Sequence, residues 1–178
     1  MDPVIDYTVR LALGLLFLVA LVHKLRAVRA FRQALAAYHI VPAGLVTGTA
    51  VAVVAIEALV LVLLGAGDRN RIGLAAAGGL LLAYAAAIAV NLLRGRDRID
   101  CGCVGSAGRD GLSWWLVGRN VGLATIAFAG MAPVVERPLT AVDWLSVIAA
   151  TMTLAGLYVA FDGLVANAAG YRRLREAT

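Results

Sequence analysis

Long apolar stretches alternate with short polar segments along the whole chain. Five stretches reach about 20 residues without an interior run of charges, the length that an α-helix needs to cross a hydrocarbon core of about 30 Å. We expect membrane-spanning helices over residues 4–22, 42–64, 72–93, 112–131 and 141–165. The pattern therefore predicts an all-α, polytopic membrane helical bundle that forms one integral-membrane domain over residues 1–178.

The segment between the first two spans has a different pattern. From Ala27 to His39, apolar residues recur at helical spacing while charged and amide side chains occupy another face. The apolar positions are Val28, Phe31, Leu35 and Tyr38, and the polar positions are Arg29, Arg32 and Gln33. A helix with two such faces lies in the membrane interface, so we expect an interfacial amphipathic helix here.

The composition agrees with a membrane protein, because 62% of the 178 residues are hydrophobic and only 15% are charged. Asp2 and Asp6 precede the first apolar stretch, where a signal peptide carries positive charge, so this stretch reads as a retained helix. The net charge of +5 is concentrated in short loops beside the spans, which favours membrane lipids as partners. Since no basic patch is interleaved with aromatic residues, nucleic-acid binding is not expected.

The basic residues are distributed unequally between the two sides of a five-span topology. Three lie on the side of the second loop: Arg69, Arg71 and Arg137. Eleven lie on the other side: Lys24, Arg26, Arg29, Arg32, Arg94, Arg96, Arg98, Arg109, Arg172, Arg173 and Arg175. The positive-inside rule therefore predicts a multi-pass protein of the cell (inner) membrane, with its N-terminus outside and the loop over residues 94–111 at the cytoplasmic face.

Both cysteines lie in that loop, in the motif Cys101-Gly102-Cys103. Two thiols separated by one glycine can close a tight ring, and strain makes such a disulfide easier to reduce than a structural one. We expect a redox-active pair. Two alternatives remain: unreactive loop thiols, or half of a metal site that His23 and His39 would have to complete.

Several polar residues lie in or beside the spans and are candidates for a supporting role. Glu57 is the clear acidic residue of a span interior, which is a functional hypothesis by default, although a hydrogen-bonded packing role is the alternative. Asn91, Arg119 and Asn120 flank the cysteine loop and either contact it or join neighbouring helices. Lys24 falls on the same side and either lines that surface or anchors its helix at the interface.

Two further charged residues lie near the ends of predicted spans. Arg10 is close to the start of the first span, so we expect its long side chain to extend to the interface. Asp162 is close to the end of the last span, and we expect it to pair with a neighbouring arginine rather than to act in catalysis.

Six short motifs are spread over the first four spans and their connections. They are His23-Lys24-Leu25, Tyr38-His39-Ile40-Val41-Pro42, Glu57, Asn91-Leu92-Leu93-Arg94-Gly95, Cys101-Gly102-Cys103-Val104-Gly105 and Arg119-Asn120. Together they resemble the MauE family, the methylamine-utilisation membrane proteins of the broader DoxX-like group. The Cys-Gly-Cys element behind an Asn-x-x-Arg-Gly span end is the most specific part. The chain departs from the family at Val104, where members often have phenylalanine.

The resemblance implies a four-helix DoxX-like core, to which this chain adds the fifth span over residues 141–165. It also implies a role in maturing or maintaining a disulfide-rich partner, the methylamine dehydrogenase light subunit, alongside a thioredoxin-like protein. The family role is extracytoplasmic, whereas the distribution of basic residues places the loop at the cytoplasmic face.

These observations together favour a membrane thiol-disulfide oxidoreductase that exchanges electrons with a thioredoxin-like protein or a disulfide-containing client. Cys101 and Cys103 are the catalytic residues of this hypothesis, and no cofactor is predicted, although a quinone or a metal remains open. One alternative is a non-enzymatic membrane assembly factor whose cysteines only latch the loop. Another is a small transporter or a quinone-linked subunit that uses Glu57.

Overall fold

The computed structural model describes residues 1–66, 71–96 and 111–176, and of residues 165–176 the backbone alone. All regular structure within these residues is helical, which confirms the predicted all-α class. The helices are α1 (Pro3–Arg26), α2 (Val28–Ala37), η1 (Ala43–Leu45, a 3-10 turn), α3 (Val46–Gly65), α4 (Arg71–Leu93), α5 (Trp114–Ala129) and α6 (Ala141–Glu176).

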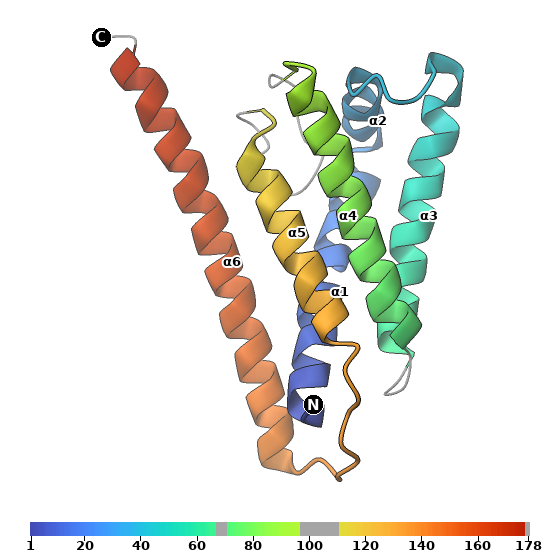
Figure 1. The fold of residues 1–178 in the computed structure, drawn as a ribbon, viewed down its shortest axis with the longest axis vertical. Coiled ribbons are helices and arrows are strands. Elements are labelled where there is room, and N and C mark those ends of the chain that lie inside the picture. Colours follow the sequence, from blue (N-terminus) through green and yellow to red (C-terminus); the bar gives the residue numbers. More distant parts are fainter. Residues whose placement is uncertain (67–70, 97–110, 177–178) are drawn as a thin grey trace.

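The long helices run alternately up and down the bundle (Figure 1). The end of the bundle that carries α2 is called the upper end, and the opposite end, where α1 starts, the lower end. The C-terminal ends of α1, α4 and α6 and the N-terminal ends of α3 and α5 lie toward the upper end. Both edges of the cysteine loop therefore lie on the same side of the bundle as α2, as the five-span topology predicts.

Four helices are long and apolar enough to cross a membrane: Pro3–Arg26, Ala43–Gly65, Arg71–Leu93 and Ala141–Leu164. The helix α5 covers 16 residues, fewer than the predicted span over 112–131. At 1.5 Å per residue it is about 24 Å long, somewhat less than a hydrocarbon core. The fifth crossing at α5 therefore stays a prediction, supported by its course beside α4 (Figure 1).

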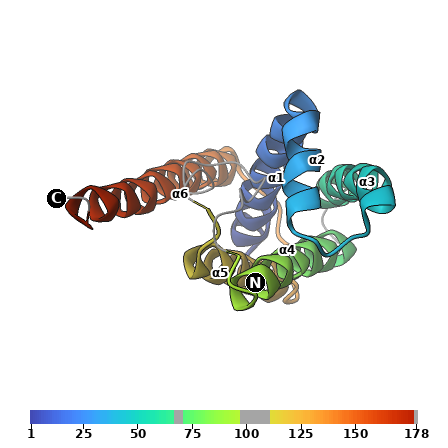
Figure 2. The same cartoon turned by 90° about the horizontal axis from the view of Figure 1, so that it is seen from above.

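The predicted amphipathic segment is the helix α2. It follows α1 directly, because Ala27 leaves the helical conformation (φ −125°, ψ 45°) and redirects the chain. Seen from above, α2 appears along its length across the upper end of the bundle (Figure 2). Its Ala34 is buried, whereas Arg29 and Arg32 are exposed, as expected for an interfacial helix.

The core is an apolar cluster in which small residues let the helices approach closely, with α4 and α5 forming the most extensive helix pair. The buried members are Leu13, Phe17, Val60, Leu64, Leu74, Ala77, Leu81, Ala124 and Ala127. Gly73 is buried in the first turn of α4, where a Cβ atom would lie 2.7 Å from the carbonyl oxygen of Leu63. A side chain at this position would force the ends of α3 and α4 apart.

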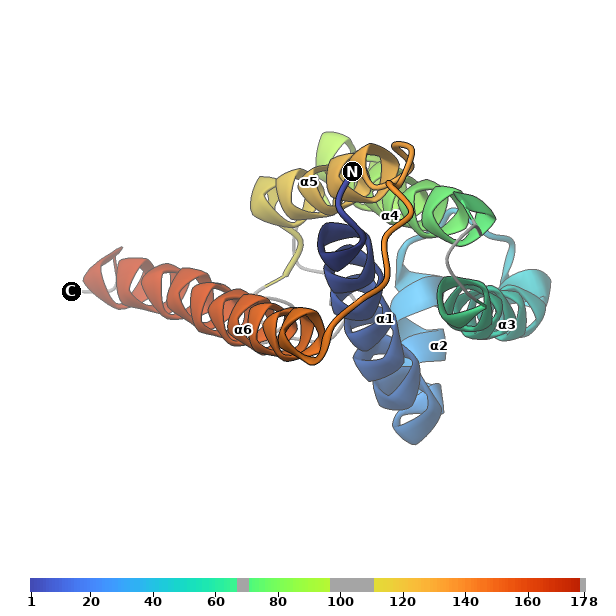
Figure 3. The ribbon, with the colours of Figure 1, turned by 90° about the horizontal axis from the view of Figure 1, so that it is seen from below.

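The last helix is attached to the bundle at its lower end and diverges from the other helices above (Figures 1 and 2). From below, the linker between α5 and α6 passes beside the N-terminal end of α1 (Figure 3). The amide of Val135 in this linker donates to the carbonyl oxygen of Met1 at 2.9 Å. The ring of Trp144 packs on that of Tyr7, with centroids 5.1 Å apart, so α6 starts against the first turns of α1.

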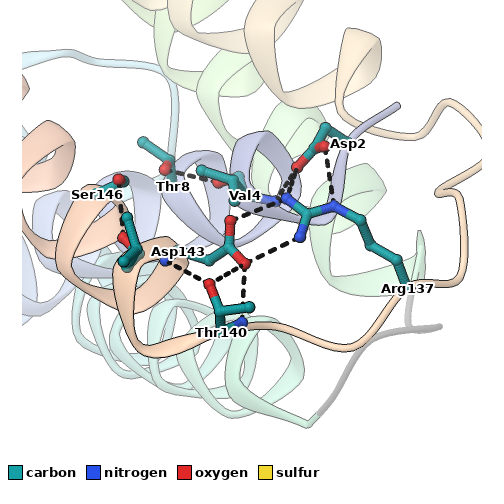
Figure 4. Close-up of polar contacts among 8 residues, drawn as sticks. Asp2, Val4, Thr8, Arg137, Thr140, Asp143 and Ser146 are labelled. Atoms are coloured by element: carbon teal, nitrogen blue, oxygen red, sulfur yellow. Dashed lines mark hydrogen bonds and ion pairs between the residues drawn. The ribbon is translucent and has the colours of Figure 1, made fainter.

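Arg137 ties this linker to both helices (Figure 4). Its guanidinium donates to both carboxylate oxygens of Asp2, at 3.1 and 3.2 Å, and to both oxygens of Asp143, at 2.9 Å each. Asp2 also caps α1 by accepting from the amide of Val4 at 2.8 Å. The hydrogen bonds from Arg137 hold the pKa of the Asp2 carboxyl below its ordinary value, and the two carboxylates raise the pKa of Arg137.

We predict that Gly73→Ala lowers the free energy of unfolding by about 1–3 kcal/mol, because the backbone of Leu63 cannot turn aside as a side chain could. Gly79→Ala is the matched control in the same helix, since a Cβ atom there would meet nothing within 4 Å. Thermal unfolding of the purified protein in detergent checks both. Equal transition temperatures for the two variants would contradict the close approach of α3 and α4.

A second prediction concerns pH. Asparagine is also a good N-cap, so Asp2→Asn removes the charge that faces Arg137 while keeping an acceptor for Val4. Because the folded-state pKa of Asp2 is depressed, its stabilisation is present above the ordinary value of about 4 and is lost as the pH falls through the folded pKa. The transition temperature of Asp2→Asn should therefore lie below that of the wild type at pH 7 and approach it at acidic pH. A gap that is the same at pH 7 and pH 3 would refute the prediction.

Candidate functional site

The chain leaves α4 toward the cysteine segment through a defined helix end. Gly95 adopts a left-handed conformation (φ +69°), which glycine accepts without steric cost. The amide of Arg96 donates to the carbonyl oxygen of Asn91 at 2.9 Å, and the amide of Gly95 donates to that of Leu92 at 3.0 Å. These two bonds form a Schellman motif. The Asn-x-x-Arg-Gly pattern found in the sequence is therefore the stop signal of α4.

The chain returns to the bundle beside a small apolar cluster at the upper end. Its buried members are Tyr38, Ile88, Leu112 and Leu116. Leu112 directly precedes α5, so the segment that carries the cysteines starts at the end of α4 and finishes in this cluster. Cys101 and Cys103 themselves lie outside the described residues. Their predicted pairing and redox activity stay predictions.

The two asparagines predicted to flank the cysteine loop are buried near the upper end. The Asn91 amide donates to the carbonyl oxygen of Ala87 at 3.0 Å, and the Asn120 amide donates to that of Leu116 at 2.9 Å. Both bonds stay within one helix. In the part of the chain that the structure describes, the Oδ1 oxygen of Asn91 has no hydrogen-bond partner although it is buried. This acceptor lies one turn before the chain leaves α4.

Lys24 and Glu57 form a buried ion pair between α1 and α3. The Lys24 Nζ atom lies 2.6 Å from Glu57 Oε1, and the two side chains are 2% and 0% exposed. The hydroxyl group of Tyr84, from α4, donates to the same oxygen at 2.5 Å. Sequence analysis placed Glu57 in a span interior, and the structure shows it bonded to side chains from two other helices.

The Lys24 ammonium group is also held by aromatic rings. Its Nζ atom lies 5.4 Å from the ring centroid of Tyr84 and 5.5 Å from that of Phe31. Both distances allow cation–π attraction, which is stronger away from water. Since Phe31 belongs to α2, a single ammonium group contacts residues of α2, α3 and α4 in addition to its own helix. The interpretation of Lys24 as an interface anchor is therefore wrong.

The hydrogen bonds of this cluster are unevenly shared between the two oxygens of Glu57. Oε1 accepts from Lys24 and from Tyr84, whereas Oε2 is buried and has no partner among the described residues. A buried ion pair repays the loss of hydration only when its remaining lone pairs are also satisfied. The free oxygen therefore marks a place where a hydrogen-bond donor would be stabilised.

A second buried ion pair lies near the lower end, within α1. Arg10 Nε donates to Asp6 Oδ2 at 2.8 Å, and the side chains are 6% and 2% exposed. The prediction that Arg10 extends to the interface is wrong, because a carboxylate one turn away neutralises it inside the bundle. Two residues of the apolar core, Leu13 and Phe17, lie between this pair and Lys24 along α1.

Arg119 pairs with Asp162 of α6, with Nη1 3.2 Å from Oδ1, which confirms the predicted arginine partner of this aspartate. The guanidinium group also lies over the ring of Tyr158, 5.6 Å from its centroid. The rings of Trp115 and Phe161 pack nearby, with centroids 5.0 Å apart. These side chains bridge α5 and α6 where the two helices diverge, so the first role of Arg119 in this structure is to link them.

Sequence reasoning missed three members of these clusters: Tyr84, Phe31 as a partner of Lys24, and the pairing of Asp6 with Arg10. The first had a signal, because Tyr84 carries a hydroxyl group inside an Ala/Leu-rich span where each polar group needs a partner. The i, i+4 spacing of Asp6 and Arg10 was also available. The contact of Lys24 with Phe31 depends on the bend at Ala27 and has no counterpart in the sequence pattern.

Comparison with known proteins places this geometry in a family context. A family model described as "Methylamine utilisation protein MauE" matches residues 2–133 and ends before α6 begins. The methylamine utilization protein MauE of Paracoccus denitrificans is 36% identical over 142 residues, which cover 78% of this chain and 76% of the relative. That of Methylophilus methylotrophus is 29% identical over 170 residues, which cover 92% and 87%. No solved structure matches the chain.

The ion pair between Lys24 and Glu57 yields a third prediction. Lys24→Met or Glu57→Met alone should lower the free energy of unfolding by about 3–5 kcal/mol, because each leaves one buried charge without its partner. The double variant should unfold within about 1 kcal/mol of the wild type or be more stable, since two apolar side chains replace the pair.

Ile56→Met, at an exposed position in the turn beside Glu57, is the control for the chemistry of methionine in α3. Thermal unfolding in detergent checks all four proteins. If the costs of the two single changes simply add in the double variant, the two side chains are not energetically coupled and the interpretation fails.

Proposed function

Because the chain belongs to the MauE family, we propose that it is a membrane thiol-disulfide redox protein that supports the maturation or redox maintenance of a partner protein in methylamine utilisation. The observation that carries this proposal is the Cys101-Gly102-Cys103 motif, which follows the Schellman end of α4 within a chain that matches the family over residues 2–133. By analogy with the family role, the partners are a thioredoxin-like protein and a disulfide-containing client.

The proposed reaction is thiol-disulfide exchange. The thiolate of one cysteine attacks a sulfur of the partner's disulfide, so that a mixed disulfide forms and the other sulfur of the partner leaves as a thiolate. The second cysteine, as a thiolate, then attacks the mixed disulfide. The Cys101–Cys103 disulfide forms and the partner departs reduced, having received two electrons. In the reverse direction, the Cys101–Cys103 disulfide oxidises a client dithiol and is itself reduced to two thiols.

The described residues support this proposal by their position at the two edges of the cysteine segment. Asn91 has a buried acceptor one turn before the segment begins, and Leu112 anchors its other edge. We assign Asn91 and Asn120 a positioning role at this end of the bundle. Lys24, Glu57 and Arg119 stabilise the helices that carry it.

For localisation we propose the inner membrane with the cysteine segment at the cytoplasmic face. This orientation rests on the excess of arginines near the upper end. A membrane-impermeant maleimide added to intact cells, before and after reduction, tests it. The reagent should label Cys101 and Cys103 only after permeabilisation, and labelling of intact cells would reverse the orientation.

Replacing both cysteines by serine should abolish growth on methylamine in a host that depends on this protein, while Ser106→Ala, a change in the same segment, should leave growth unchanged. Normal growth of the double variant would refute the redox mechanism and favour a non-enzymatic assembly factor. In addition, one of the two single serine variants should accumulate a mixed disulfide with its partner, because the attacking cysteine remains and the resolving one is gone. Non-reducing electrophoresis followed by mass spectrometry detects the adduct and identifies which cysteine attacks.

The free oxygen of Glu57 favours a second candidate function, in which the Lys24 cluster binds a hydrogen-bond-donating group such as a quinol inside the membrane. The stability-neutral double variant Lys24→Met/Glu57→Met separates the two functions. Normal methylamine growth of this folded variant would restrict the cluster to a structural role. Loss of growth in a stable protein would assign it a chemical one.

A further inference from the structure

The exposed charges of the two ends of the bundle differ in sign. Five exposed arginines lie at the upper end: Arg26, Arg29, Arg32, Arg94 and Arg96. Two carboxylates with described side chains lie toward that end, those of Glu57 and Asp162, and both are buried and paired, with Lys24 and Arg119 respectively. The upper end, as far as the structure describes it, therefore presents a positively charged surface without exposed acidic groups.

The lower end is balanced by contrast. Its exposed arginines within the described residues are Arg71 and Arg137, and the latter is engaged by two carboxylates. Asp2 and Glu136 are also exposed here. A general affinity for anions would therefore act at the upper end and not at the lower one.

Exposed apolar side chains lie close in sequence to the upper arginines. They are Leu25, Val28, Ile40, Leu45 and Leu93. Leu25 and Val28 flank the bend between α1 and α2, and Leu93 directly precedes Arg94. The helix α2 appears lengthwise across this end (Figure 2), which is the orientation of a helix lying in a membrane interface.

One of the arginines is held in place by the fold. Arg32 Nη2 donates to the hydroxyl group of Thr47, in the first turn of α3, at 2.6 Å. This bond ties α2 to α3 and uses one of the five donors of the guanidinium group, leaving the others for a ligand. The arginine surface thus includes a guanidinium group whose place is set before a ligand arrives.

We propose that the upper end of the bundle binds the headgroups of anionic phospholipids, with α2 as its main binding element. Guanidinium groups match phosphate oxygens with paired hydrogen bonds, and each arginine near an anionic surface strengthens the attraction. The adjacent apolar side chains favour a lipid over an acidic protein, because acyl chains cover Leu25, Val28 and Leu93 while the headgroups meet the arginines. This inference does not depend on the thiol chemistry.

The test uses the full chain reconstituted in phosphatidylcholine vesicles that contain trace spin-labelled lipid. Electron paramagnetic resonance gives the relative association of spin-labelled phosphatidylglycerol and phosphatidylcholine with the protein. We expect phosphatidylglycerol to associate at least about threefold more strongly at low salt, and the preference to shrink as the salt concentration rises.

Two double variants, Arg29→Gln/Arg32→Gln and Arg94→Gln/Arg96→Gln, should each reduce the preference. Arg71→Gln, at the lower end, should leave it unchanged. Loss of the Arg32–Thr47 bond could destabilise the first double variant. The second double variant remains informative in that case, because the side chains of Arg94 and Arg96 form no ion pair among the described residues.

Equal association of the two lipids with the wild-type protein would overturn the proposal. A preference that Arg71→Gln removes as strongly as the upper-end variants do would also overturn it, because the effect would then follow net charge alone. The wild type could instead show no lipid preference and bind an acidic peptide such as polyglutamate. If the same arginine variants then lose the peptide, the surface binds an acidic protein and the proposal is wrong.

Discussion

The fold depends on the need to keep ionised side chains neutralised inside an apolar helical bundle. An unpaired charge in such a place costs several kcal/mol, so each buried charge constrains where its partner lies. The Lys24–Glu57 pair is the strongest constraint of this kind. Its ammonium group contacts side chains of three other helices, α2, α3 and α4, and so connects all four helices at one buried point. The Asp6–Arg10 and Arg119–Asp162 pairs apply the same rule within α1 and between α5 and α6.

This constraint explains why short motifs far apart in the sequence belong together. The His-Lys-Leu element contributes Lys24, the acidic residue of the second span is its partner, and both lie in the part of the chain that the MauE family model matches. The Asn-x-x-Arg-Gly element serves a different purpose, because Gly95 and the carbonyl oxygen of Asn91 end α4 where the cysteine segment begins. The family motifs therefore combine a charge cluster that holds the bundle with a helix end that directs the chain toward the cysteine segment.

Much of the architecture was predictable from the sequence because it depends on the length and period of apolar runs. The amphipathic α2, the positions of α1, α3, α4 and α6, and an arginine partner for Asp162 all follow from such local patterns. The partners of Lys24 were not predictable, since they come from three helices whose relative rotation is a tertiary property. Arg10 was misinterpreted because a long side chain near a span end can either reach water or pair with a carboxylate of its own helix. In this chain Arg10 pairs with Asp6, one turn before it. The sequence analysis treated Lys24, Glu57, Asn91 and Asn120 as one set of supporting polar residues. In the structure, Lys24 and Glu57 pair with each other, whereas Asn91 and Asn120 each bond within their own helix.

The apolar core has a consequence for how the polar groups of the bundle are separated from one another. Leu13 and Phe17 on α1, Val60 and Leu64 on α3, and Leu74 and Leu81 on α4 all fall on the lower side of the Lys24 cluster. A layer of this kind acts as an electrical insulator, because neither a hydrated ion nor a chain of water molecules is stable among hydrocarbon side chains. Along α1, the Asp6–Arg10 pair and Lys24 are therefore separated by apolar side chains, which disfavour a chain of water molecules between the two polar clusters.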